Sequence, residues 1–192
     1  MRADAVWAPV RWPGLEHAVL SGPSRAPRLD SLAVLVLDDQ PVRVSCRLSC
    51  DVGWRVRRLA VKVSGVETTR LTLQSDGQGE WVDEVRGCPV PELHGCIDVD
   101  LSTTPLTNTL PIRRLGLAVG AARDLMVAYI NVPELTFSAV AQRYTRTSSS
   151  AYRYESGSFR ADLPVDEHGL VLDYPGDWRR IPVKPDSRRL ES

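Results

Sequence analysis

Segment 93–115 holds the densest run of chemically capable side chains in this sequence, with two carboxylates, several hydroxyls and amides, and paired arginines. Asp98 and Asp100 lie two residues apart, so on a β-strand both carboxylates project from one face. Two close carboxylates perform acid–base catalysis when their surroundings separate their pKa values, as in glycosidases. The same carboxylates can instead pair with Arg113 and Arg114 and anchor the following segment to a sheet. One interpretation is therefore a hydrolase or isomerase of a sugar-containing substrate, with Asp98 or Asp100 as base and His94 as partner; the other is architectural.

The cysteines and the known catalytic motifs give no sign of a metal or cofactor site. Cys46 and Cys50 are spaced C-x3-C, and Cys88 and Cys96 are spaced C-x7-C, so neither pair has the two-residue spacing common in structural zinc sites. No G-x-S-x-G elbow, H-E-x-x-H motif or glycine-rich phosphate loop is present. The sequence therefore predicts no metal and no cofactor, and we expect binding rather than catalysis.

Charge and composition exclude other classes of partner. The 24 basic and 24 acidic residues balance, which gives no electrostatic case for nucleic acid or an anionic membrane. The longest aliphatic run, Leu32 to Leu37, is far shorter than a membrane span, so no stable membrane insertion is expected. The N-terminus lacks the apolar region of a secretory signal, and the cysteines should be reduced thiols. We therefore expect a cytoplasmic protein, whose oligomeric state one sequence does not reveal.

The elements that must position these residues are mainly β-strands. Alternation is strict from Val42 to Cys50, and it changes parity near Arg57-Arg58, which predicts a β-bulge there. The cluster from Ser75 to Gly79 predicts a hairpin turn that returns the chain through Trp81. Five more strands are predicted later, at Leu125–Val132, Leu135–Tyr144, Tyr152–Glu155, Ser158–Leu163 and Leu170–Tyr174.

Helices are few in this pattern. Thr109 can N-cap a short helix that tolerates Pro111 in its first turn and ends at Gly116 or Gly120. A second short helical turn is predicted within Arg11–Leu20. The hydroxyl-rich stretch Thr145–Ser150 is typical of a mobile loop. Residues 1–180 are expected to form one domain, and residues 181–192 a disordered tail.

The aromatic residues offer two interpretations. Most occupy predicted strands or strand ends, where packing in the core is the default role for large rings. They can also line a ligand groove beside a few polar anchors. Trp178 follows a Pro-Gly turn and precedes two arginines, which suits the rim of such a groove. Tyr144 alternates with polar neighbours, which is compatible with facing a cleft.

The sequence resembles the putative glycolipid-binding family of bacterial proteins over roughly residues 40 to 180. The central run Thr104-Pro-Leu-Thr-Asn-Thr-Leu-Pro-Ile-Arg-Arg114 is the specific part. The other matching pieces, in chain order, are Asp51-Val-Gly-Trp54-Arg-Val, Asp76-Gly-Gln-Gly79-Glu-Trp81, Gly95-Cys-Ile-Asp98-Val-Asp100, Gln142-Arg-Tyr144 and Gly169-Leu-Val-Leu-Asp-Tyr-Pro-Gly176.

This resemblance implies a spiral β-roll, a single strongly curved antiparallel sheet with one or two short helices, similar to lipoprotein carriers. It also implies a role in glycolipid recognition, although folds host unrelated functions. We therefore predict a non-catalytic protein whose apolar concave sheet face takes the acyl chains of a small amphiphile. A polar site that includes the two arginines is predicted to bind its sugar or phosphate head group. The predicted ligand-binding residues are Asp98, Asp100, Thr107, Asn108, Arg113, Arg114, Tyr144 and Trp178.

Overall fold

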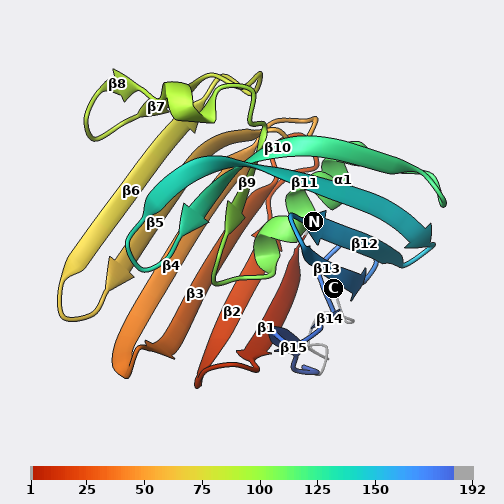
Figure 1. Cartoon of the computed structure of the whole chain (residues 1–192), viewed down its shortest axis with the longest axis horizontal. Coiled ribbons are helices and arrows are strands. Elements are labelled where there is room, and N and C mark those ends of the chain that lie inside the picture. The colour runs from red at the N-terminus through yellow and green to blue at the C-terminus, as the bar shows by residue number, and fades with distance from the viewer. Residues whose placement is uncertain (1, 184–192) are drawn as a thin grey trace, which may run out of the picture.

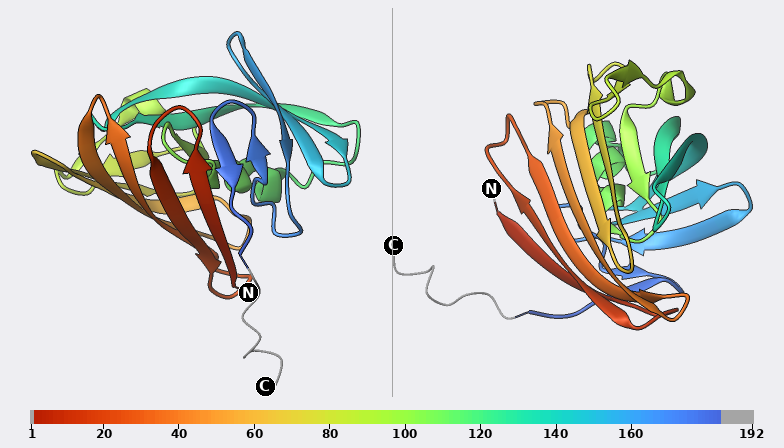
Figure 2. Two further views of the ribbon diagram at one scale, coloured as in Figure 1. Left: turned by 90° about the horizontal axis from the view of Figure 1, so that it is seen from below. Right: turned by 90° about the vertical axis from the view of Figure 1, so that its left-hand side faces the viewer.

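The computed structural model describes residues 2–183 and is mainly β, with two sheets (Figure 1). The large sheet has ten strands in the order β14-β15-β1-β2-β3-β4-β5-β6-β7-β8. It curves strongly and does not close into a barrel (Figure 2). Its strands are β1 (Ala3–Pro9), β2 (Gly14–Ser21), β3 (Arg28–Leu37), β4 (Gln40–Cys50), β5 (Val56–Ser64), β6 (Thr68–Ser75), β7 (Trp81–Asp83), β8 (Cys88–Pro89), β14 (Asp173–Tyr174) and β15 (Trp178–Arg180).

The second sheet has five strands in the order β13-β12-β11-β10-β9 and arches across the concave side of the large sheet (Figure 1). Its neighbouring strands are antiparallel except for β9 and β10, which run parallel. The parallel pairing places Asp98 beside Val127 and Asp100 beside Tyr129. The strands are β9 (Asp98–Leu101), β10 (Ala122–Asn131), β11 (Thr136–Ser148), β12 (Ala151–Ser156) and β13 (Phe159–Pro164).

The predicted alternation on β4 and β5 is confirmed by burial. The inward side chains of β4, from Val42 to Cys50, are all buried, and the arginines between them are exposed. The predicted bulge is confirmed as well, because Cys50 pairs with Val56 while Ser49 pairs with Arg58, which leaves one extra residue on β5. The predicted hairpin is present, with Ser75 opposite Trp81.

A short helical segment lies between the two sheets (Figure 2). It consists of the 3₁₀ turn η2 (Leu106–Asn108) and the helix α1 (Thr109–Leu115); a further 3₁₀ turn, η1 (Pro91–Leu93), precedes β9. The helix ends at Gly116, as predicted, because this residue adopts the left-handed conformation that glycine tolerates. The N-cap is Asn108, not Thr109, whose hydroxyl instead donates a hydrogen bond to the Gly169 carbonyl at 3.1 Å.

Three further local predictions were wrong. Most of the predicted helical turn Arg11–Leu20 belongs to strand β2, whose inward residues Glu16, Ala18 and Leu20 are buried and alternate with more exposed ones. The predicted loop Thr145–Ser150 is strand as far as Ser148, because β11 continues its pairing with β12 beyond Tyr144. Of the predicted strand Leu170–Tyr174, only Asp173 and Tyr174 belong to a strand. The predicted disordered tail falls mainly on 184–192, outside the described residues.

The protein's own side chains fill the concave side of the large sheet. Leu59 and Leu73 of that sheet belong to the same buried core as Leu106 and Leu110 of the helical segment, and as Val99, Leu101 and Ile130 of the second sheet. This packing removes apolar surface from water, which stabilises the fold by about 25 cal/mol per Å². The apolar face that the sequence suggested for acyl chains is therefore covered by the helical segment and the second sheet.

Candidate functional site

A cleft of about 350 Å³ remains where the second sheet meets the β14-β15-β1 edge of the large sheet. Its walls come from segments far apart in the chain, including the β1–β2 loop, the residues that follow β9, and β10 to β15. The volume falls at the lower end of the range for small-molecule pockets, about 300–1,000 Å³. The lining residues are Arg11, Trp12, Asp100, Leu101, Ser102, Thr104, Asn108, Tyr129, Val140, Tyr154, Ser156, Phe159, Tyr174, Asp177 and Trp178.

Aromatic rings dominate the walls of this cleft. Trp12 and Trp178 meet edge to face, with ring centroids 6.1 Å apart. Tyr154, Phe159 and Tyr174 form a second group in which each centroid lies 6.0–6.2 Å from the other two. Phe159 is 36% exposed, whereas Trp178 is only 3% exposed. Large rings at the mouth and wall of a cleft suit a ligand that has an apolar face.

Asp100 is the central polar group of the cleft. Its Oδ1 accepts a hydrogen bond from Thr107 Oγ1 at 2.9 Å, and its Oδ2 accepts one from Gln142 Nε2 at 2.6 Å. Tyr154 donates a longer one to Oδ2, at 3.5 Å. Burial raises the pKa of the Asp100 carboxyl, and the hydrogen bonds that it accepts offset part of this rise. These bonds fix the orientation of the carboxylate and leave acceptor capacity for a ligand, since a carboxylate offers about four lone-pair sites.

Three tyrosines share the surroundings of this carboxylate. Burial raises the pKa of Tyr129, Tyr154 and Tyr174, and in each case the negative charge of Asp100 adds to the rise. All three phenols therefore stay protonated at neutral pH and keep hydroxyl groups near the carboxylate. The cleft thus combines hydroxyl groups that donate and accept hydrogen bonds with a carboxylate whose orientation is fixed.

Asn108 and Tyr144 form a buried polar pair behind this wall. Asn108 Nδ2 donates to the Tyr144 hydroxyl at 2.8 Å, and both residues are almost completely buried. Asn108 also lines the cleft. The Tyr144 ring meets Tyr154 edge to face at 5.3 Å, so it supports a cleft residue.

A buried carboxyl, Glu16 on β2, holds the segment that follows β9. The Thr104 hydroxyl lies 2.7 and 2.8 Å from the two Glu16 carboxyl oxygens and donates to them. The same hydroxyl accepts a hydrogen bond from the Leu106 N–H at 3.0 Å. Glu16 is 0% exposed, and burial raises its pKa to about 7. Glu16 therefore fixes the position of Thr104, which lines the cleft.

Asp98 and Arg114 form an ion pair that does not line the cleft. Arg114 donates to both carboxylate oxygens of Asp98, with contacts of 2.6–3.1 Å, and the Asp98 side chain is completely buried. This bidentate geometry anchors α1 to β9. Arg113 lies over the Trp54 ring at 5.1 Å. The two arginines are thus committed to structural contacts.

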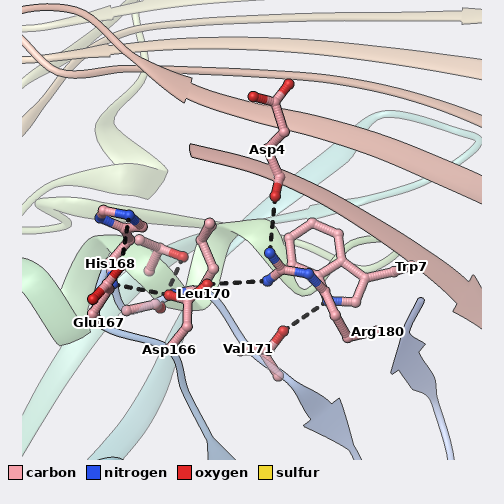
Figure 3. Close-up of polar contacts among 10 residues, drawn as sticks. Asp4, Trp7, Asp166, Glu167, His168, Leu170, Val171 and Arg180 are labelled. Atoms are coloured by element: carbon pink, nitrogen blue, oxygen red, sulfur yellow. Dashed lines mark hydrogen bonds and ion pairs between the residues drawn. The ribbon is translucent and has the colours of Figure 1, made fainter. Parts of the chain in front are cut away.

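A second polar network joins β1 to the chain's C-terminal segment, which carries β15 (Figure 3). Arg180 donates to Asp166 Oδ2 at 3.3 Å and to the Asp4 carbonyl at 2.9 Å. Its guanidinium lies 5.3 Å from the centre of the Trp7 ring, and Trp7 Nε1 donates to the Val171 carbonyl at 2.8 Å. These contacts fix β15 beside β1, and β15 supplies a cleft tryptophan.

The structure brings only some of the predicted site residues together. Asp100, Asn108 and Trp178 line the cleft, with Trp178 inside it and not at an exposed rim. Thr107 and Tyr144 lie directly behind them and bond to cleft residues. Asp98, Arg113 and Arg114 lie elsewhere. His94, the predicted catalytic partner, is exposed and pairs with Glu80 at 2.7 Å, so it does not accompany Asp100.

Sequence reasoning missed several cleft residues. Trp12 stands in a loop that follows β1, and nothing near it in the sequence connects it to Asp100. The sequence shows three of these residues as aromatic residues on strands, namely Tyr129, Tyr154 and Tyr174. It does not show that they lie close together, because this depends on which strands pair. Gln142 does not line the cleft but bonds to Asp100; it precedes the predicted Tyr144 by two residues, and the shared face of a strand is the signal that would have found it.

Neither a metal cluster nor a membrane-spanning helix occurs in the described part of the chain. No group of three or more His, Cys, Asp or Glu side chains within residues 2–183 is arranged to hold a metal ion. No helix among these residues is long and apolar enough to cross a membrane.

Comparison with known proteins gives a family and two structural relatives. A family model described as "Putative glycolipid-binding" matches residues 4–180. A DUF1089 family protein from Pseudomonas aeruginosa is 37% identical, with a TM-score of 0.78 over 88% of this chain and 92% of that one. A beta-barrel-like protein of DUF1849 from Brucella abortus, 12% identical, has a TM-score of 0.56 over 95% of both chains, which shows a shared fold. No curated protein matches this chain.

Proposed function

This chain belongs to the family described as "Putative glycolipid-binding", and from that premise we propose that the cleft between the two sheets binds the polar head group of a glycolipid or related amphiphile without transforming it. The observation that carries this proposal is the combination of aromatic walls with oriented polar groups, Asp100 and Asn108, in one cleft. Sugar rings have apolar C–H faces that pack on aromatic rings, and hydroxyl edges that hydrogen-bond to carboxylates and amides.

The size of the cleft favours the head group over the whole lipid. A volume of about 350 Å³ is near the lower limit for ligand pockets, which is small for long acyl chains. The concave face that would otherwise suit acyl chains is filled by buried side chains such as Leu59 and Leu110. The proposal therefore leaves the acyl chains outside the cleft, and Phe159, at its exposed edge, is the first residue that they would meet.

The proposal also includes a cytoplasmic location. Support comes from the four cysteines, all of which are free thiols, because free thiols persist in reducing compartments.

The proposal is tested by isothermal titration with octyl β-glucoside below its micelle concentration. The chain has two phenylalanines, Phe159 in the cleft and Phe137 on β11 outside it, which provide a matched pair of variants. We expect Phe159→Leu to weaken binding about fivefold, since an aromatic contact contributes about 1 kcal/mol beyond its area. Phe137→Leu should leave affinity unchanged. Equal losses of affinity in both variants would refute a head-group site in this cleft.

A further inference from the structure

The charged groups of the cleft do not balance. Three charged side chains line it, namely Asp100, Asp177 and Arg11. Arg11 pairs with Asp177, with Nε 2.6 Å from Oδ1, so these two charges largely cancel. In the described part of the chain no arginine, lysine or histidine forms an ion pair with Asp100. All three of its hydrogen-bond donors, Thr107, Gln142 and Tyr154, are neutral.

Asp98, on the same strand, differs from Asp100 in having a counter-charge. Asp98 is completely buried, and the bidentate Arg114 guanidinium neutralises it, whereas Asp100 is partly buried at the wall of the cleft. Taking an ionised carboxylate out of water without a counter-charge is costly, so proteins either provide a cation for it, as for Asp98, or hold it protonated, as for Glu16. Asp100 has the hydrogen bonds that orient a carboxylate but lacks that cation. A ligand entering the cleft is the remaining source of positive charge.

The aromatic walls suit the same kind of ligand. The face of an aromatic ring carries negative electrostatic potential, so ammonium groups are attracted to tryptophan and tyrosine rings within about 6 Å. Trp12, Trp178 and Tyr174 line the cleft together with Asp100. An anionic head group, by contrast, would meet an unpaired carboxylate and one arginine already engaged by Asp177. The paired arginines that the sequence suggested for a phosphate lie outside the cleft, at Asp98 and Trp54.

We propose that the head group selected by this cleft carries an ammonium group, which lies against Asp100 and the surrounding aromatic faces. This inference rests on the proposed function and specifies its ligand class. The ammonium group can belong to an amino sugar or to a quaternary amine head group, since both present a cation with apolar surroundings. Burial raises the pKa of the Asp100 carboxyl, and a bound cation would lower it again, which is consistent with this assignment.

The test uses ligands matched in shape but not in charge, titrated into the full-length protein at about pH 7. Octyl 2-amino-2-deoxy-β-glucoside is compared with octyl β-glucoside, and choline with its neutral isostere 3,3-dimethylbutan-1-ol. Octyl β-glucuronide provides an anionic head group. We expect at least one cation to bind tenfold or more tightly than its neutral partner, and the glucuronide to bind most weakly of the glycosides. The amino sugar pair and the choline pair show which source of ammonium the cleft accepts.

A matched substitution assigns the preference to one carboxylate. Asp100→Asn should reduce the ratio of cation to neutral affinity to near one, whereas Asp124→Asn, at an exposed carboxylate on β10, should preserve it. The wild-type ratio alone decides the question if Asp100→Asn does not fold. Equal binding of cation and neutral partner in both pairs, tightest binding of the glucuronide, or a ratio that Asp100→Asn leaves unchanged would overturn the inference while leaving head-group binding intact. Failure of every glycoside and of choline to bind would instead remove the proposed function itself.

Discussion

The buried Glu16 carboxyl should make the stability of this protein fall as pH rises through neutrality. Glu16 is 0% exposed, and its pKa is raised from 4.5 to about 7 because burial disfavours the charged form. The folded state therefore holds a proton that the unfolded chain releases at lower pH. The contribution of this bound proton to the free energy of unfolding is complete below about pH 4.5 and is lost as pH rises through about 7.

The size of this effect follows from the pKa difference. A rise from 4.5 to about 7 is roughly 2.5 pKa units, and each unit corresponds to about 1.4 kcal/mol. Ionisation of Glu16 above pH 7 should therefore destabilise the folded protein by about 3 kcal/mol relative to acidic conditions. Glu16→Gln keeps the shape and a carbonyl acceptor for the Thr104 hydroxyl, but it does not ionise. The variant should lack this part of the pH dependence.

The assay is urea unfolding of wild type and Glu16→Gln between about pH 5 and pH 8.5, analysed as the difference in unfolding free energy. Taking the difference cancels other groups that titrate in this range. We expect it to shift by about 3 kcal/mol in favour of Glu16→Gln as pH rises. Glu67→Gln, at an exposed carboxylate between β5 and β6, is the control and should show no such shift. A difference that stays constant across this range would refute the assignment of a raised pKa to Glu16.

Two further predictions concern the ion pair and the thiols. Arg114→Ala should lower the free energy of unfolding by about 3–5 kcal/mol, because it leaves Asp98 buried without its counter-charge. The neighbouring Arg113 is exposed, and Arg113→Ala loses only its contact with the Trp54 ring, which should cost less than about 1 kcal/mol. Thermal or urea unfolding of both variants checks this, and equal losses would contradict it. Cys88 is exposed and the other three cysteines are buried, so the folded protein should show one fast-reacting thiol towards Ellman's reagent, and Cys88→Ser should abolish it.

The strands were predictable where one face of a strand is buried and the other is not. From Val42 to Cys50 every second residue is apolar, so one register alone buries the whole set, and the structure adopts it. The bulge near Arg57 was predictable for the same reason, because a change of parity in the pattern requires an extra residue. Alternation of apolar residues depends only on which side of a strand is buried, and this local burial is what the sequence predicted correctly.

The site was predictable only in part, because sequence order does not give side-chain direction or long-range pairing. Arg113 and Arg114 are adjacent, yet one lies over Trp54 and the other binds Asp98, since successive residues on a helix point in different directions. Trp12 reaches Trp178 only because β1 pairs with β15. That pairing joins the two ends of the chain, and no periodicity within either end indicates it.

Asp98 and Asp100 show most clearly what separates a structural polar group from a candidate binding group. Both lie on β9, where Asp98 is completely buried and Asp100 is partly buried, and burial raises the pKa of both carboxyls. Asp98 has an arginine partner, so its interactions are complete within the fold, and changing it should alter stability first. Asp100 has oriented hydrogen bonds and no cation, so its electrostatic surroundings are incomplete until a ligand binds. A carboxylate that lines a cleft and has no cation beside it, and not the spacing of carboxylates along the sequence, is therefore what points to this site.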